Sequence, residues 1–136
     1  MAISLLWMAS CAATGAPGNP APHLLVLREV DSGKWHRVGL EDTVSIELAS
    51  NPTTGFLWKV TRIDPAVAMV DPAQTYVPDR VPPGIVGSGG KTIFPLRLLR
   101  PGKTEIVLEY RRPFENKPEP EKQVIFRLEI VPGSSR

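Results

Sequence analysis

The sequence predicts an all-β fold, an antiparallel β-sandwich of about seven to eight short strands. Apolar side chains alternate with polar ones along several segments, and this period of two is typical of antiparallel strands with one face in water. The chain also has 15 prolines among 136 residues, about twice ordinary usage, and proline is poorly tolerated inside helices. No segment has the pattern of a long amphipathic helix, and residues 65–72 have room for little more than a turn.

The alternation locates the main strands in chain order. Their apolar positions are Val44, Ile46 and Leu48; Phe56, Trp58 and Val60; Thr92, Phe94, Leu96 and Leu98; Ile106, Leu108 and Tyr110; and Val124, Phe126, Leu128 and Ile130. The sequence Arg-Pro-Gly-Lys at residues 100–103 predicts a turn between two of these strands. Trp58 alternates inward with its neighbours, so we expect it in the core, and we expect Tyr110 between the sheets.

Charge and cysteine content exclude several classes of function. The chain has 16 basic and 14 acidic residues, well mixed, with a net charge of +2; a nucleic-acid partner would require Lys and Arg clustered on one face. Cys11 is the only cysteine, so no intrachain disulfide can form. His23 and His36 have no cysteine nearby and no metal-ligand spacing occurs, so we expect no metal and no cofactor. No Ser, His and acid trio stands out, so no catalytic residue is assigned and an enzyme is not predicted.

The start of the chain has the features of an export signal. Its apolar run is far shorter than the roughly 20 residues that span a bilayer, and it ends in small residues directly before a cysteine. This resembles a bacterial lipoprotein signal, with Met8-Ala9-Ser10-Cys11 as the cleavage box and Cys11 as the lipid-bearing residue. No Lys or Arg precedes the run. Two alternatives therefore stay open, namely a misplaced start or a buried apolar arm in which Cys11 is an ordinary thiol.

Three regions are expected along the chain. Residues 1–22 form a lipoprotein signal remnant and a flexible tether, because residues 14–22 are rich in Ala, Gly and Pro. Residues 23–132 form the folded domain, and residues 133–136 a disordered tail. The protein is predicted to be exported and to be either periplasmic or lipid-anchored to the bacterial envelope, with membrane attachment through Cys11.

Three short segments interrupt or end the alternating runs, so each is expected on a loop or at a strand edge, where binding residues are common. They are Asn51, Pro52, Thr53, Thr54, Gly55 and Phe56; Gly87, Ser88, Gly89 and Gly90; and Arg112, Pro113 and Phe114. Taken singly, each has an ordinary explanation, namely a tight turn, a flexible linker and a strand end with a half-buried aromatic. None of the three contains a plausible catalytic group.

In this order and at about these spacings, the three segments resemble the motifs of the chagasin family of cysteine peptidase inhibitors. The Asn-Pro-Thr-Thr-Gly-aromatic segment, with Trp58 two residues on, is the most specific part. The resemblance covers the chain from about residue 24 to residue 131. It implies an immunoglobulin-like antiparallel β-sandwich in which three neighbouring loops form a wedge that plugs the active-site cleft of papain-like peptidases.

The resemblance also implies a role for each segment. Thr53 and Thr54 would face the catalytic centre of the peptidase. Gly89 and Gly90 would allow close backbone approach on the unprimed side of the cleft, with strand-like contacts. Phe114 would be an aromatic anchor on the primed side. The family typically has Trp there, and Phe has less area and no indole N–H, which predicts a lower primed-side affinity.

Two residue types in these segments have further consequences. Pro52 fixes φ and Gly55 can adopt positive φ, so the threonines between them are held in a preset turn. A preset loop loses less conformational entropy on docking.

For Arg112, two roles stay equally open: holding the third loop through hydrogen bonds, or contacting the partner.

The leading hypothesis is a reversible, non-covalent inhibitor of papain-family cysteine peptidases, active as a monomer in a one-to-one complex. The alternative is an exported β-sandwich binding or adhesion module that uses the same loops, or a sheet edge, to bind a non-peptidase partner. The fold alone does not decide between them, since sandwiches of this kind serve many functions.

Overall fold

The computed structural model describes residues 21–85 and 87–134, and the predictions for Cys11 and the rest of residues 1–20 lie outside this part of the chain. The described residues form strands and two short 3₁₀ helices, with no α-helix among them. The strands are β1 (Leu24–Leu27), β2 (Trp35–Gly39), β3 (Thr43–Ser50), β4 (Leu57–Arg62), β5 (Ala68–Val70), β6 (Thr75–Pro78), β7 (Gly90–Leu98), β8 (Gly102–Arg111) and β9 (Lys122–Val131). The 3₁₀ helices are η1 (Glu29–Asp31) and η2 (Pro52–Thr54). Neither could span a membrane.

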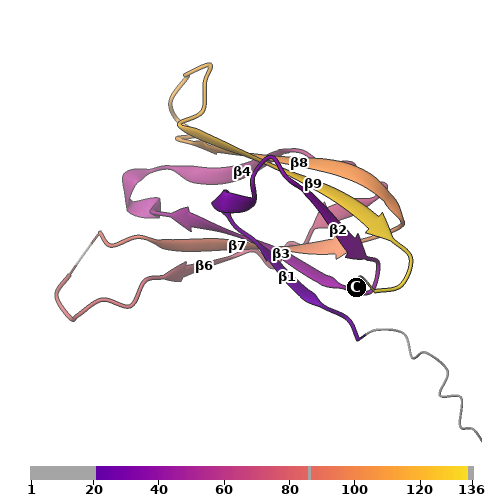
Figure 1. The fold of residues 1–136 in the computed structure, drawn as a ribbon. Coiled ribbons are helices and arrows are strands. Elements are labelled where there is room, and N and C mark those ends of the chain that lie inside the picture. Colours follow the sequence, from indigo (N-terminus) through magenta and orange to yellow (C-terminus); the bar gives the residue numbers. More distant parts are fainter. Residues whose placement is uncertain (1–20, 86, 135–136) are drawn as a thin grey trace, which may run out of the picture.

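The strands form two layers, which confirms the predicted β-sandwich (Figure 1). One sheet has the order β1, β3, β7, β5, with β6 also paired to β7; the other has the order β2, β9, β8, β4. The described residues hold nine strands, against an expected seven to eight. The short strands β5 and β6 were not predicted, because three or four residues among prolines are too few to show an alternating pattern.

Both sheets are mixed, although most of their strand pairs are antiparallel as predicted. β1 lies parallel to β3, and β2 lies parallel to β9. The reason is that the chain crosses to the other layer after β1, so β1 and β2 do not form a hairpin and each lies along a strand of the same direction. Alternation indicates which face of a strand is buried but carries no information on strand direction.

The core lies between the two sheets and contains the side chains that alternation predicted. The predicted positions that are buried are Val44, Ile46, Leu48, Trp58, Phe94, Leu96, Ile106, Leu108, Tyr110, Val124, Phe126, Leu128 and Ile130. An aromatic cluster closes one end of this core: the Tyr110 ring centroid lies 4.8 Å from that of Trp58 and 5.1 Å from that of Phe56. The indole N–H of Trp58 donates to the Ala49 carbonyl oxygen at 2.9 Å, so its one polar atom is satisfied.

The three segments singled out in the sequence lie at this aromatic end. The first loop, residues 51–56, joins β3 to β4; the second loop, residues 79–85 and 87–89, joins β6 to β7; and the third loop, residues 112–121, joins β8 to β9. Pairing of Ser50 with Gly90 and of Leu57 with Arg111 places the bases of the loops at one end of the sandwich. Figure 1 shows all three extending from the end opposite the C-terminal end of β9.

The last described residues contact the domain. The Gly133 carbonyl oxygen accepts a hydrogen bond from the Glu41 amide at 2.8 Å. A Cβ at Gly39 would collide with the Gly133 backbone. Gly133 and Ser134 therefore lie against the backbone at Gly39.

Candidate functional site

The first loop is a single turn of 3₁₀ helix with a side-chain cap. Asn51 precedes η2, and its side-chain oxygen accepts hydrogen bonds from the Thr53 amide, at 3.3 Å, and from the Thr53 hydroxyl. The Thr54 hydroxyl donates back to the Asn51 carbonyl oxygen at 2.7 Å. Asn is a preferred cap, and proline fits the first helical position because its fixed φ is already helical. The turn is therefore preset, as Pro52 predicted.

Gly55 ends this turn in a conformation that other residues rarely adopt. Its φ is +82°, and its amide donates to the Pro52 carbonyl oxygen at 3.0 Å. A Cβ at this position would lie 3.0 Å from an edge carbon of the Phe114 ring. Gly55 thus serves two purposes, since it permits positive φ and leaves room for the aromatic residue of the third loop.

The second loop is joined to the first by a side-chain hydrogen bond. The amide nitrogen of the Asn51 side chain donates to the Gly87 carbonyl oxygen at 3.0 Å, while the Asn51 backbone amide donates to the Tyr110 hydroxyl at 3.1 Å. Gly87 has φ +74°, which favours glycine. Asn51 therefore links the second loop and the aromatic cluster to the first loop.

The predicted glycines of the second loop differ in what surrounds them. Gly87 is exposed, and Ser88 and Gly89 are half-buried. The Gly89 carbonyl oxygen accepts from the Asp79 amide at 3.0 Å, which closes the base of the loop. Gly90 is buried within β7, and a Cβ there would collide with the Val77 carbonyl oxygen. Contacts within the chain account for Gly90, whereas residues 87–89 belong to the loop itself.

Arg112 holds the third loop to the first. Its Nε donates to the Thr54 carbonyl oxygen at 2.9 Å, and its guanidinium carbon lies 4.3 Å from the Phe56 ring centroid. Its Nη1 donates to Glu115 at 2.7 Å. Arg112 thus makes the hydrogen bonds expected of the scaffold role, one of the two roles that the sequence left open.

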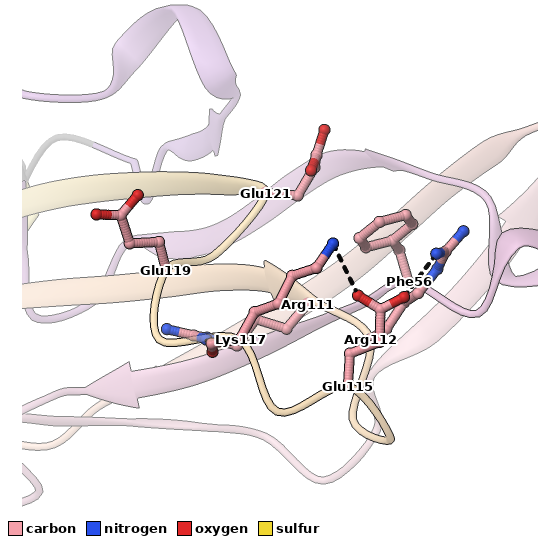
Figure 2. Close-up of a pocket in the computed structure, with 7 residues that line it drawn as sticks. All are labelled: Phe56, Arg111, Arg112, Glu115, Lys117, Glu119 and Glu121. Atoms are coloured by element: carbon pink, nitrogen blue, oxygen red, sulfur yellow. Dashed lines mark hydrogen bonds and ion pairs between the residues drawn. The ribbon is translucent and has the colours of Figure 1, made fainter.

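Glu115 lies between two cations, as Figure 2 shows. One carboxylate oxygen accepts from Arg112, and the other lies 3.1 Å from the Lys117 ammonium. The hydrogen bond from Arg112, followed by that from Lys117, holds the pKa of the Glu115 carboxyl below its usual value. The ion pairs of Glu115 were not predicted from the sequence. The signal that could have indicated the pair with Arg112 is the spacing of three residues between them.

Arg111 forms hydrogen bonds with the second half of the third loop. Its guanidinium donates to the Lys117 carbonyl oxygen at 2.8 Å and to the Pro118 carbonyl oxygen at 3.0 Å, and it pairs with Glu109 at 2.7 Å. This role was also not predicted, because two successive basic residues do not show which of them points back onto the chain. The result is a loop of ten residues whose backbone is held at several points.

The same end of the molecule exposes an aromatic side chain. Phe114 is 75% exposed, the second most exposed of the large hydrophobic side chains in the described part of the chain, and only one edge of it meets Gly55. Pro52, Thr53 and Thr54 are exposed beside it. A rigid, mostly uncharged tip with an aromatic ring at one side is suited to fitting a cleft and contains no group positioned for acid–base chemistry.

Comparisons with known proteins agree with this arrangement. The family profile "Chagasin family peptidase inhibitor I42" matches residues 37–130. Amoebiasin-2 of Entamoeba histolytica is 30% identical over 110 residues, covering 81% of this chain and 86% of its own length. The crystal structure of the cysteine protease inhibitor EhICP2 from Entamoeba histolytica has a TM-score of 0.74 at 26% identity, covering 82% of this chain and 99% of that one. The solution structure of Amebosin has a TM-score of 0.62 at 30% identity, covering 81% and 99%.

The profile match spans more than two thirds of the chain and includes all three loops. It confirms the resemblance that the order of the three motifs indicated, and it identifies a family of inhibitors rather than of enzymes. The chain belongs to the chagasin family of cysteine peptidase inhibitors.

Proposed function

We propose that this protein inhibits papain-like cysteine peptidases by inserting the first, second and third loops together into the active-site cleft. The observation that carries the proposal is the linkage of the three loops: Asn51 bonds to Gly87, and Arg112 bonds to Thr54. Loops that are already joined lose little conformational entropy on docking. Such a wedge binds as one rigid body.

Each loop has a distinct part in this mechanism. The first loop, with Thr53 and Thr54 exposed at its tip, faces the catalytic thiol and imidazole of the peptidase. It offers hydroxyl groups rather than a scissile carbonyl, so the complex is non-covalent and reversible. Gly87, Ser88 and Gly89 lie along the unprimed side, where their backbone groups pair with the groove that binds extended substrates. Phe114 packs on the primed side.

The protein acts as a monomer and forms a one-to-one complex in this mechanism, because the wedge is complete within one chain. It is exported and held at the envelope by a lipid on Cys11. The support for this second part is the sequence Met8-Ala9-Ser10-Cys11 alone. Mass spectrometry of the mature protein tests it: a diacylglyceryl-modified N-terminal Cys11 is expected, and an unmodified chain that retains residues 1–10 would contradict it.

Thr54→Arg tests the placement of the first loop. Thr54 is exposed, so a long cationic side chain is accommodated by the free protein, whereas it fills the space next to the catalytic residues in the complex. We expect a large loss of papain inhibition with an unchanged circular dichroism spectrum. A folded Thr54→Arg variant that inhibits as well as the wild type would contradict the insertion of this loop.

A further inference from the structure

The two flanks of the first loop differ in chemistry. On the side of the third loop, the pocket drawn in Figure 2 is lined by Phe56 and six charged residues, Arg111, Arg112, Glu115, Lys117, Glu119 and Glu121. On the side of β6, a groove is lined by Pro52, Leu57, Trp58, Gln74, Thr75, Tyr76 and Thr92. No charged residue is among those that line this groove, which we call the β4–β6 groove.

The β4–β6 groove follows the open side of the sandwich. β4 is the last strand of its sheet, and β6 pairs only with β7, so both strands present an unpaired edge within the described fold. Leu57 at the start of β4 is 48% exposed, next in the chain to the buried Trp58. The groove is therefore accessible, uncharged and partly apolar.

The β4–β6 groove is continuous with the surface that enters the cleft. Pro52 belongs both to the groove and to the first loop. β6 contributes Thr75 and Tyr76 to the groove and then leads directly into the second loop at Asp79. The groove therefore adjoins the loops that the proposed function places in the cleft.

We propose that the β4–β6 groove is a second contact surface for the same peptidase, and that it receives an uncharged, largely apolar part of the cleft wall on the side of the second loop. This inference rests on the proposed inhibitory function. With the groove included, the interface extends from the loop tips along the β4–β6 side of the domain. Leu57 and Gln74, which lie outside the three motifs, then contribute to affinity. A charge placed in the groove loses water on docking without gaining a partner.

The test is papain inhibition by the full chain and by Leu57→Asp, with Leu99→Asp as the matched control. Leu99 is 44% exposed, close to the 48% of Leu57, but it lies in the turn between β7 and β8, away from the three loops. We expect Leu57→Asp to raise the inhibition constant at least about tenfold, which corresponds to about 1.4 kcal/mol. Leu99→Asp and the conservative Leu57→Met should inhibit like the wild type.

Gln74→Glu provides a second variant in case Leu57→Asp is poorly folded. Gln74 is exposed on the opposite wall of the groove, so the substitution adds charge with little effect on packing. Leu57→Asp and Gln74→Glu variants that are folded and inhibit like the wild type would overturn the groove contact while the inhibitory function stands. A wild-type protein that fails to inhibit papain would instead overturn the function on which this inference rests.

Discussion

The side-chain amide of Asn51 donates a hydrogen bond to the carbonyl oxygen of Gly87, 36 positions later in the sequence, at 3.0 Å. The same side chain caps η2 through its oxygen. One residue therefore sets the shape of the first loop and its position relative to the second. This explains why asparagine is suited to this position better than the other preferred caps, since Asp, Ser and Thr can cap a helix but offer no amide donor of this reach.

Asn51→Asp isolates the link between the two loops. Aspartate keeps the oxygen that caps η2, so we expect the free energy of unfolding to change by less than about 1 kcal/mol. It has no N–H to donate to Gly87, so the loops are no longer preorganised and the inhibition constant for papain should rise roughly tenfold. Urea unfolding and inhibition assays measure the two effects. Equal inhibition by Asn51→Asp and wild type would show that this hydrogen bond does not position the loops.

Gly55→Ala and Gly33→Ala form a matched pair, because their φ angles are +82° and +83°. A non-glycine residue in this region costs about 1–2 kcal/mol, so both variants should be destabilised by that amount in urea. Only a Cβ at Gly55 would meet the Phe114 ring; at Gly33 nothing lies within 4 Å. We therefore expect Gly55→Ala alone to weaken papain inhibition. A similar loss for Gly33→Ala would mean that stability, and not the position of Phe114, determines affinity.

Phe114→Ala should separate binding from folding. The side chain is 75% exposed, so its removal should leave the melting temperature nearly unchanged. Loss of an aromatic anchor costs about 2 kcal/mol of binding free energy, a rise of roughly thirtyfold in the inhibition constant. Phe114→Trp should lower that constant below the wild-type value. The control is Trp35→Ala, an aromatic residue 57% exposed on β2 and outside the three loops, which should inhibit normally. A normal inhibition constant for Phe114→Ala would exclude the ring from the interface.

Glu115→Gln should change how stability depends on pH. The pKa of Glu115 is lowered in the folded protein by Arg112 and Lys117, so the carboxylate favours the folded state above the unfolded pKa of about 4.3. That contribution is lost as the pH falls through the lowered folded value. The wild type should therefore melt at a higher temperature than Glu115→Gln at pH 7 and at pH 5, and the difference should shrink below about pH 4. A difference that is constant from pH 7 to pH 2 would contradict this ion pair.

Most of the architecture and the location of the site follow from sequence patterns. Alternation through Val44, Ile46 and Leu48 predicts which face of β3 is buried, and Pro52 with Gly55 predicts a rigid turn, because these signals are local. Strand direction does not follow, since the pairing of β1 with β3 depends on the crossing of the chain between layers. Hydrogen bonds between loops cannot be predicted from the sequence either. The position of Arg112 in the chain does not show that its guanidinium will reach Thr54, 58 positions earlier.

The family's glycine-rich motif illustrates the same limit. Its residues look equivalent in sequence, yet Gly87 accepts the bond from Asn51 on the loop, whereas Gly90 is buried against β6. The difference comes from the pairing of Gly90 with Pro78, which is a property of the folded sheet. A glycine that permits approach of a partner and a glycine that permits approach of the chain's own backbone have the same sequence signal.

Titration of papain with the protein, followed by hydrolysis of a small fluorogenic peptide, tests the central claim most directly. The three-loop wedge predicts competitive, reversible inhibition that saturates at one inhibitor per active peptidase, with activity recovered on dilution. If papain and a panel of cathepsin-like peptidases remain fully active at micromolar concentrations of folded protein, the wedge does not enter such clefts. The loops would then be the binding surface for a partner of another class.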